Sequence, residues 1–254
     1  MGALHAGHVA LLQAARHQDD IVVASIFVNP LQFDRQQDLD SYPRSVEADL
    51  KVCDDCGVDF VFAPEEAELY PAPQLTFVTS PVLSATLCGQ FRPGHFRGVA
   101  TVVLKLFNVV QPDRAYFGEK DAQQLAIVRR MVQDLNVPLT VVPVATVREP
   151  DGLAISSRNK LLTPEQRDIA PVLSRALREV VGLIGNGERS VPLLREQALA
   201  TFAASPQARV EYFEIVDPEV LASVESINGP VLIAAALWLG LVRLIDNMSW
   251  PGPA

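Results

Sequence analysis

The sequence is poor in cysteine and histidine, and it carries no excess of positive charge. It has 3 cysteines and 4 histidines in 254 residues, and its 30 acidic residues against 21 lysines and arginines give a net charge of −9. An acidic surface of this kind excludes a general nucleic-acid binder, although a local basic pocket can still hold a small anion. An odd number of cysteines without a secretory signal indicates a reducing, cytoplasmic compartment.

Long hydrophobic runs are lacking as well. The longest late apolar run, residues 231–242, is shorter than the roughly 20 residues that span a bilayer, and it predicts a buried strand with its turn. No charged and apolar leader opens the chain, so we expect neither a signal peptide nor a membrane partner. The 49% of apolar residues is enough for the core of one large domain or two modest ones.

The few cysteines do not define a site. Cys53 and Cys56 form a C-x-x-C pair that would suit a redox centre or half of a zinc site, but no second pair accompanies them. They lie at the end of a helix predicted over residues 44–56, with Gly57 as its stop. This position favours two ordinary small side chains, and Cys88 suggests no role either.

Apolar runs alternate with helix-like segments over the first 147 residues. The runs do not alternate with polar residues, which is typical of strands buried on both faces of a parallel sheet. This order predicts an α/β fold with a doubly wound parallel sheet. We expect strands at 21–28, 58–62, 114–117 and 139–147, and helices at 44–56, 98–110 and 121–135.

The pattern changes near residue 147. A polar stretch precedes two helical segments and three strand-like runs, which predicts a smaller α+β domain. We therefore expect two domains, 1–146 and 147–254, and a frayed tail after residue 248. The helices are expected at 163–184 and 191–203, and the strands at 210–216, 231–239 and 242–245.

Three polar clusters fall where an open α/β sheet binds its ligands, and a fourth lies in the loop between the two predicted domains. Such ligands lie beyond the carboxyl ends of the strands and at helix N-termini. Because these ends meet at one crevice, we expect the clusters to converge there. The clusters are residues 5–8, 29–33, 117–124 and 155–159.

His5 and His8 flank Gly7 just ahead of the first predicted helix. Residues three apart share a helical face, and a glycine lets a ligand approach the backbone, so the pair suits a polyphosphate. A zinc site would need a third ligand, for which there is no strong candidate. Two solvated loop histidines are the remaining interpretation.

Two cations and two glutamines are further candidates. Lys120 follows Gly118, and Arg158 follows two serines, so an ammonium and a guanidinium could both bind phosphate oxygens. Gln32 and Gln124 could bind a hydroxyl or a carboxylate without adding charge. Taken alone, a lysine on a loop is usually only solvated, and the glutamines are more simply explained as surface residues.

Six stretches together resemble the pantothenate synthetase family, whose members are also called pantoate–β-alanine ligases. An H-x-G-H motif alone is weak, because it recurs in other nucleotidylyltransferases and in class I aminoacyl-tRNA synthetases. The six occur in the order and at about the spacing of the family and cover essentially the whole chain. They are MGALHAGH, SIFVNPLQF, RPGHFRGV, FGEKDAQQL, DGLAISSRN and WLGLVRLIDN.

The resemblance implies an ATP-dependent ligase that joins pantoate to β-alanine through a pantoyl adenylate and releases AMP and diphosphate. It implies a Rossmann-like N-terminal domain, a smaller C-terminal domain acting as a lid, a homodimer, and Mg²⁺ bound with ATP; no residue is assigned as a protein metal ligand.

The resemblance also implies the site residues. His8 would be the usual proton donor, with His5, Lys120 and Arg158 as the other catalytic residues. Gln32 would contact pantoate and β-alanine, and Gln124 pantoate. The ATP-binding residues would be Met1, Gly2, Ala3, Leu4, His5, Ala6, Gly7, His8, Gly118, Glu119, Lys120, Asp121, Val147, Ile155, Ser156, Ser157 and Arg158.

The residues suit this reaction. A carboxylate is already ionised at pH 7, so the first step needs charge stabilisation and in-line positioning rather than a base. The second step needs a neutral amine and a site from which water is excluded. No cysteine or serine nucleophile forms a triad, in keeping with a non-covalent enzyme.

The sequence departs from the family pattern at its N-terminal end. The family pattern carries a strand and a turn before the equivalent of Met1, so we expect an internal start and a loss of activity with it. Two alternatives stay open: another nucleotidylyltransferase with a different acceptor, and a truncated, weakly active or inactive remnant that only binds ATP or pantoate.

Overall fold

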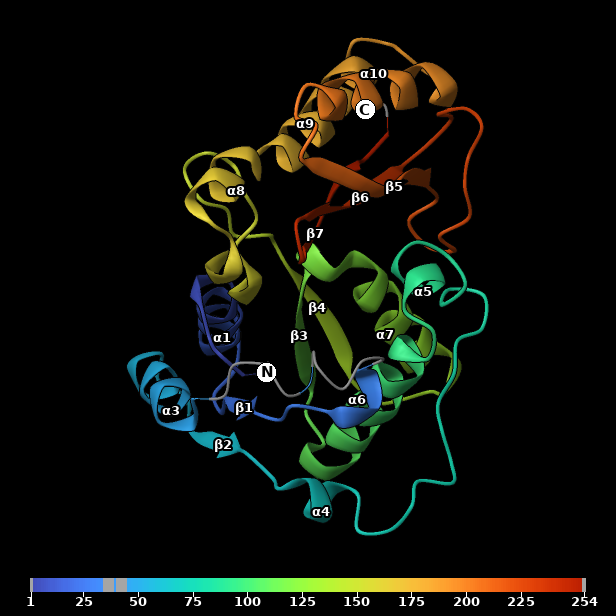
Figure 1. Ribbon diagram of the computed structural model, residues 1–254. Coiled ribbons are helices and arrows are strands. Elements are labelled where there is room, and N and C mark those ends of the chain that lie inside the picture. The colour runs from blue at the N-terminus through green and yellow to red at the C-terminus, as the bar shows by residue number, and fades with distance from the viewer. Residues whose placement is uncertain (1, 34–38, 40–44, 253–254) are drawn as a thin grey trace. The chain divides into compact units, whose positions relative to one another are not determined.

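The computed structural model describes residues 2–33, 39 and 45–252, and the chain divides into two compact units (Figure 1). Unit 1 consists of Met1–Ala85, Gly89–Glu119 and Ile127–Ala145, and unit 2 of Thr86–Cys88, Lys120–Ala126 and Thr146–Ala254. Two short segments of the first half of the chain therefore group with unit 2. The division into domains 1–146 and 147–254 stays a prediction.

The strands of unit 1 are paired in parallel, as the sequence predicts. β1 (Val23–Ser25) pairs with β2 (Phe60–Phe62), and β3 (Arg114–Gly118) pairs with β4 (Thr140–Val144). Among the described residues, these strands form two separate pairs. β1 is shorter than the predicted strand 21–28, and Phe60 in β2 is 63% exposed, so the expected burial on both faces is wrong for this pair.

The helices of the first 145 residues follow the predicted order. α6 begins three residues before the predicted position 98, because Gly94 adopts a left-handed conformation (φ 82°) that starts the helix earlier. α3 ends as predicted, with Cys56 as its last capping residue and Gly57 at φ 71°. The elements are α1 (Ala6–Gln18), η1 (Pro30–Gln32), α3 (Val46–Asp55), α4 (Glu66–Leu69), α5 (Cys88–Phe91), α6 (His95–Val110), η2 (Glu119–Asp121) and α7 (Ala122–Asp134).

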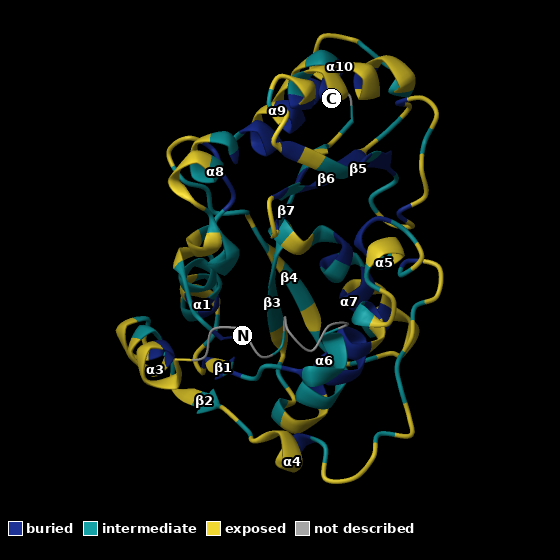
Figure 2. Ribbon diagram, in the orientation of Figure 1, coloured by how far each residue is buried: buried dark blue, intermediate teal, exposed yellow. Residues whose placement is uncertain are grey.

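Unit 2 is built on a three-stranded antiparallel sheet in the order β5–β6–β7, against which two helices pack. The central strand is almost wholly buried, and the helices bury their apolar faces against the sheet (Figure 2). This is the α+β arrangement that the sequence predicts. Its elements are η3 (Ser157–Leu161), α8 (Pro164–Ile169), α9 (Val172–Gly185), α10 (Val191–Ala203), β5 (Ala208–Val216), β6 (Val231–Leu239) and β7 (Val242–Trp250).

Two predictions for this unit are wrong in detail. The helical segment 163–184 is interrupted between α8 and α9, where Pro171 serves as the N-cap of α9. The strand expected to end at residue 245 continues to Trp250, so residues 249 and 250 belong to β7 and not to a frayed tail. Trp250 packs against the apolar core of the unit, which explains the longer strand.

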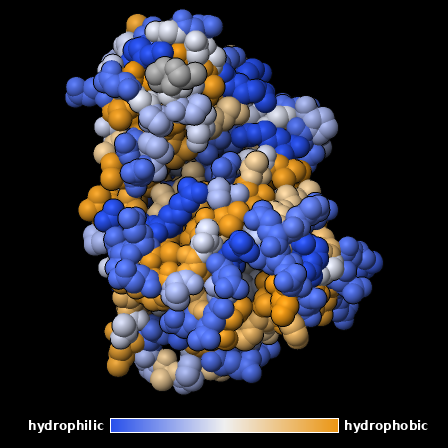
Figure 3. Space-filling view, turned by 180° about the vertical axis from the view of Figure 1, so that it is seen from behind, coloured by the Kyte–Doolittle hydropathy of each residue, from blue (hydrophilic) through white to orange (hydrophobic). Residues whose placement is uncertain are grey.

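The surface of the chain mixes polar and apolar residues. Figure 3 shows this mixture on one face, and the large exposed apolar side chains come from many different elements and loops. None of the helices within the described ranges has the length and the apolar character that crossing a membrane requires. Cys53, Cys56 and Cys88 all lie within these ranges and form no disulfide.

Candidate functional site

His5 and His8 together cap the N-terminus of α1. The helix begins at Ala6, so His5 is its N-cap and His8 lies in the first turn, not ahead of the helix as predicted. Nδ1 of His5 accepts a hydrogen bond from the backbone N–H of Gly7 at 3.2 Å, and Nδ1 of His8 accepts from the N–H of His5 at 3.2 Å. The two side chains therefore satisfy backbone donors that a helix N-terminus leaves without partners.

The two capping hydrogen bonds fix which ring nitrogen carries the proton in His5 and in His8. An imidazole whose Nδ1 accepts a hydrogen bond carries its ring proton on Nε2, so both histidines present an Nε2–H donor. The ring centroids lie 4.1 Å apart. A Cβ on Gly7 would lie 3.0 Å from Cε1 of His5, which explains why glycine stands between the histidines. Two such donors at a helix N-terminus suit an anionic ligand.

Asp49 holds the segment that leads into α1. Its carboxylate accepts hydrogen bonds from the backbone N–H of Ala3 at 2.9 Å and of Leu4 at 2.7 Å. The residue is only 3% exposed, and Ala3 adopts the left-handed region at φ 51°, which is costly for a residue other than glycine. Asp49 thus fixes the backbone beside the histidines. Met1 lies outside the described residues.

Sequence reasoning missed Asp49. It occupies the first turn of α3, where an acidic residue is common because it interacts favourably with the helix dipole. Nothing in its local sequence distinguishes this buried acceptor from an ordinary solvated carboxylate.

Asn29 orients the side chain of Gln32. Asn29 is 2% exposed, and its amide nitrogen donates to Oε1 of Gln32 at 3.2 Å and to the carbonyl of Gly98 at 3.1 Å. Its amide oxygen accepts from the hydroxyl of Tyr70 at 2.9 Å. Burial, and secondarily the charge of Glu66, raises the pKa of Tyr70 to about 12, so its hydroxyl stays a donor further into the alkaline range than an ordinary phenol does.

The backbone of Gln32 is held from the other side. Nδ1 of His95 lies 2.7 Å from the carbonyl oxygen of Gln32, which can only accept, so this nitrogen carries the proton. Arg92 donates to the same carbonyl at 3.4 Å and lies 3.3 Å from Nε2 of His95. Asn29 lies in the predicted cluster 29–33 and Arg92 in the motif RPGHFRGV, but the sequence analysis assigned no role to either, and it did not single out Tyr70.

The cluster at 117–124 follows β3 directly. The strand ends at Gly118, η2 carries Glu119, Lys120 and Asp121, and Gln124 lies half-buried in the first turn of α7. A Cβ on Gly118 would meet no atom within 4 Å, so the backbone is open at this point. These residues therefore follow the carboxyl end of a parallel strand, as predicted.

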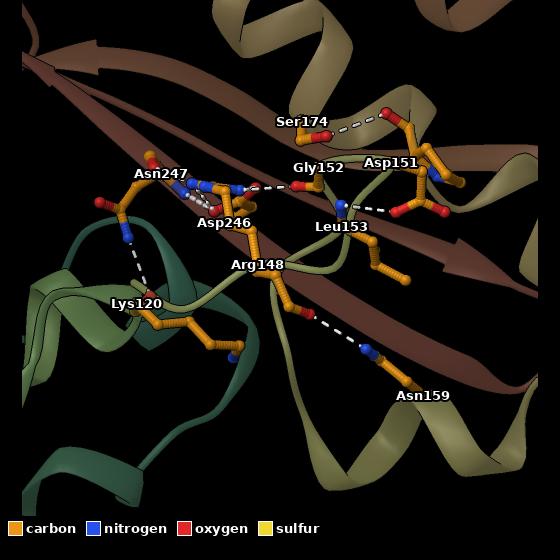
Figure 4. A network of polar contacts seen from close by, with 11 residues as sticks. Lys120, Arg148, Asp151, Gly152, Leu153, Asn159, Ser174, Asp246 and Asn247 are labelled. Carbon is orange, nitrogen blue, oxygen red and sulfur yellow. Dashed lines mark hydrogen bonds and ion pairs between the residues drawn. The ribbon is translucent and has the colours of Figure 1, made fainter. Parts of the chain in front are cut away.

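The cluster at 155–159 follows a tight hairpin. Arg148 and Ala154 form an antiparallel bridge, and the N–H of Ile155 donates to the carbonyl of Val147 at 3.0 Å. The hydroxyl of Ser156 then caps η3 by accepting from the N–H of Arg158 at 3.3 Å. Figure 4 shows this hairpin together with Lys120 and part of β7.

The candidate residues fall into two groups. Unit 1 carries His5, His8 and Gln32 with their supporting contacts, and unit 2 carries Lys120, Gln124 and the segment from Val147 to Arg158. The convergence of all four clusters on one crevice stays a prediction. Within the part of the chain that the structure describes, no group of three or more His, Cys, Asp or Glu side chains could hold a metal ion.

Comparison with known proteins supplies a further finding. The family model for pantoate-beta-alanine ligase matches residues 1–249. A pantothenate synthetase from Moorella thermoacetica is 52% identical over 248 residues, which cover 98% of this chain and 88% of that protein. The crystal structure of the pantothenate synthetase from Thermus thermophilus superimposes with a TM-score of 0.94 at 48% identity, covering 98% of this chain and 90% of that one.

A more distant structure carries ligands. The pantoate-beta-alanine ligase from Francisella tularensis, complexed with beta-gamma ATP and beta-alanine, superimposes with a TM-score of 0.79 at 33% identity and covers 98% of this chain and 86% of that one. These likenesses confirm the Rossmann-like α/β fold class with its smaller C-terminal part and the family resemblance that the sequence motifs indicate.

Proposed function

Because the chain belongs to the pantoate–β-alanine ligase family, we propose that it joins pantoate to β-alanine at the expense of ATP, through a pantoyl adenylate. The observation that carries this proposal is the family match over nearly the whole chain. The capped histidine pair at the start of α1 gives it a local chemical basis, since two Nε2–H donors at a helix N-terminus suit the phosphates of a nucleotide.

In the first step, the pantoate carboxylate attacks the α-phosphate of ATP, a P–O bond to that phosphate forms, and diphosphate leaves. The carboxylate is ionised at neutral pH, so the chain has to orient the reactants and stabilise phosphate charge. His5 and His8 would do this through hydrogen bonds from Nε2–H to phosphate oxygens, which a neutral imidazole donates while keeping its proton. Lys120 and Arg158 would add two positive charges.

In the second step, the neutral amine of β-alanine attacks the acyl carbon and forms the amide C–N bond. The bond from that carbon to the phosphate oxygen breaks, AMP leaves, and the amine nitrogen releases a proton to solvent. Gln32 would contact both acids, and Gln124 would contact pantoate. The support that Gln32 receives from Asn29 is consistent with this role, because a fixed amide orients a substrate at a lower entropic cost.

The remaining ATP contacts are proposed from the family resemblance. Unit 1 would supply backbone and side-chain contacts around the capped histidines and at the end of β3, and unit 2 would supply those after Lys120 and along the hairpin. The set comprises Met1, Gly2, Ala3, Leu4, Ala6, Gly7, Gly118, Glu119, Asp121, Val147, Ile155, Ser156 and Ser157.

Mg²⁺ would enter as part of the nucleotide substrate. This ion commonly binds through phosphate oxygens, water and one or two carboxylates rather than through a cage of protein ligands. We further propose a homodimer, to be tested by light scattering, and a cytoplasmic location, where ATP is available and unpaired cysteines such as these persist.

The reaction is tested by measuring AMP from ATP with pantoate and β-alanine each omitted in turn. We expect AMP release only when all three substrates are present, and an enzyme-bound pantoyl adenylate when β-alanine is omitted. Release of ADP in place of AMP would contradict the adenylate mechanism. Turnover of ATP that does not depend on β-alanine would instead indicate a different acceptor.

A further inference from the structure

The last motif of the sequence, WLGLVRLIDN, ends in two buried polar residues that the proposed reaction does not use. Asp246 and Asn247 lie on β7, and the side chain of Asp246 is only 1% exposed. Buried polar groups need hydrogen-bond partners, so the identity of those partners shows what the pair holds in place. All of the contacts described below lie within unit 2. Figure 4 shows those that join Arg148, Asp246, Asn247 and Lys120.

Asp246 binds Arg148 through two parallel hydrogen bonds. Nη1 of Arg148 lies 2.6 Å from Oδ2 of Asp246, and Nη2 lies 3.0 Å from Oδ1. The same guanidinium donates to the carbonyls of Gly152 at 3.1 Å and of Asn247 at 3.3 Å. A paired guanidinium and carboxylate of this kind fix both distance and orientation. Asp246 therefore ties the hairpin at Arg148–Ala154 to the strand β7.

This hairpin leads directly into the proposed nucleotide contacts. The N–H of Glu149 donates to the carbonyl of Leu153 at 2.8 Å, and the N–H of Ile155 donates to the carbonyl of Val147 at 3.0 Å. Its two arms are thus joined on both sides of the bridge between Arg148 and Ala154. Because the hairpin is joined in this way, holding Arg148 in place also holds in place the start of the segment 155–158.

Asn247 holds the other proposed contact. Its side-chain amide donates to the backbone carbonyl of Lys120 at 2.8 Å, and its own backbone N–H donates to Oδ1 of Asp246 at 2.8 Å. One carboxylate oxygen therefore accepts from both Arg148 and Asn247. The two segments that carry Lys120 and Arg158 are connected to a single point on β7, although neither segment belongs to the sheet.

We infer that Asp246 and Asn247 are positioning residues that set Lys120 and the segment 155–158 relative to each other for ATP. Neither residue is placed in contact with the nucleotide. The inference rests on the proposed function, because it assumes that these two segments bind ATP. A purely structural role would instead stabilise unit 2 without any preference for one substrate.

The test compares steady-state kinetics of Asn247→Ala and Asp246→Asn with the wild type and with Lys120→Ala. Glu214→Gln is the matched control, because Glu214 on β5 forms an ion pair at 2.6 Å with Arg195 on α10, remote in sequence from both segments. The KM values for ATP and pantoate and the Kd of a non-hydrolysable ATP analogue are measured. A loss of folded protein lowers the maximal rate but leaves KM unchanged, so KM separates positioning from folding.

We expect Asn247→Ala and Asp246→Asn to raise the KM for ATP and the Kd of the analogue about tenfold, a change of about 1.4 kcal/mol in binding free energy. The KM for pantoate should stay within about twofold of the wild type, and Glu214→Gln should change neither constant. If Asp246→Asn does not fold, Asn247→Ala decides the question.

Two results would overturn the inference alone while leaving the proposed function intact. One is an unchanged KM for ATP in Asn247→Ala alongside a clear defect in Lys120→Ala, and the other is an equal rise in the KM for both substrates. If Lys120→Ala itself leaves the ATP reaction unchanged, the nucleotide assignment of Lys120 fails, and the positioning role fails with it.

Discussion

We assign different roles to the two ring nitrogens of His8, and one substitution separates these roles. Nδ1 accepts the N–H of His5, whereas Nε2–H is the proposed phosphate donor. In His8→Asn the amide oxygen can occupy the place of Nδ1 and keep the cap, because asparagine is a good acceptor near helix N-termini. The donor at Nε2 is lost.

We expect His8→Asn to fold with a melting temperature close to that of the wild type and to form the adenylate about 10²–10⁴-fold more slowly. Single-turnover adenylate formation and thermal unfolding measure the two effects. His17→Asn is the control, because His17 is exposed at the other end of α1 and should keep full activity. Normal adenylate formation by His8→Asn would show that Nε2 has no such role.

Asp49 gives a second prediction. Both of its carboxylate oxygens accept backbone N–H groups, and the amide of Asp49→Asn can supply only one acceptor and would turn its NH₂ toward the other donor. We expect this variant to lose about 1–3 kcal/mol of unfolding free energy in urea. Asp55→Asn on the same helix should have little effect, because Asp55 is exposed and its ion pair with Lys51 lies at the surface. Equal stability of the two variants would contradict the buried anchoring role.

The histidines could be found from the sequence and Asp49 could not, for a physical reason. The spacing of His5 and His8 is a local property of one helical turn, so it can be read directly. Asp49 meets Leu4 across 45 positions of the chain, and only the packing of α3 beside α1 brings its carboxylate to that backbone. The same holds for Asn29 and Gly98, which are 69 positions apart.

The contact between α6 and η1 decides where Gln32 lies. A Cβ on Gly98 would come within 2.2 Å of the carbonyl oxygen of Leu31 and 2.6 Å of the backbone nitrogen of Gln32. No side-chain rotation can relieve a clash with backbone, so the two elements would have to move apart. The glycine in the RPGHFRGV motif is therefore a packing requirement.

We expect Gly98→Ala to destabilise the protein by about 1–3 kcal/mol and to raise the KM for both pantoate and β-alanine. Gly182→Ala is the matched control, since it also lies within a helix, α9, and its added Cβ meets nothing within 4 Å. That variant should gain about 0.4–1 kcal/mol. Urea unfolding measures the stability of both variants, and initial rates give their KM values. If Gly98→Ala is destabilised but keeps the wild-type KM values for pantoate and β-alanine, η1 is not part of the proposed binding site for the two acids.

The order and type of the helices and strands could be predicted, while their ends often could not. Periodicity located α10 and β6 at their observed bounds. It placed the start of α6 at residue 98, because His95 and Phe96 look like part of a polar loop until Gly94 is known to be left-handed. β7 is longer than its apolar pattern because Asp246 and Asn247 interrupt that pattern while still being paired with β6.

The tyrosines give the protein a common response to alkaline pH. Burial, and then the hydrogen bond to Asp19, raises the pKa of Tyr116 to about 12, and burial likewise raises the pKa of Tyr70 to about 12. Burial raises the pKa of Tyr212 well above its ordinary value, with the neighbouring Cys88 as a further cause. In the unfolded chain these phenols ionise near pH 10.

A group whose pKa is higher in the folded state stabilises that state fully below its unfolded value and loses this effect as the pH rises through the folded value. We therefore expect the melting temperature to fall between pH 10 and about pH 12. Ultraviolet titration of phenolate should show that these three tyrosines ionise later in the folded protein than in urea. A folded protein in which every tyrosine titrates near pH 10 would contradict the burial seen here.

The grouping of distant segments into unit 2 could not be predicted from the sequence. Composition and periodicity change near residue 147, which is a local signal. Residues 86–88 and 120–126 carry no such signal. They join unit 2 through contacts between residues that are far apart in the sequence, such as Cys88 with Tyr212 and Lys120 with Asn247.

These contacts also set an order of events during synthesis on the ribosome. Lys120 and Asn247 are 127 positions apart, so the carbonyl of Lys120 waits roughly 6–25 s for its partner when translation adds about 5–20 residues each second. Cys88 waits still longer for Arg243, which lies 155 positions later. Throughout that interval the nascent chain carries both segments without these partners, and a chaperone that binds the chain would have to release both segments before the proposed ATP contacts could assemble.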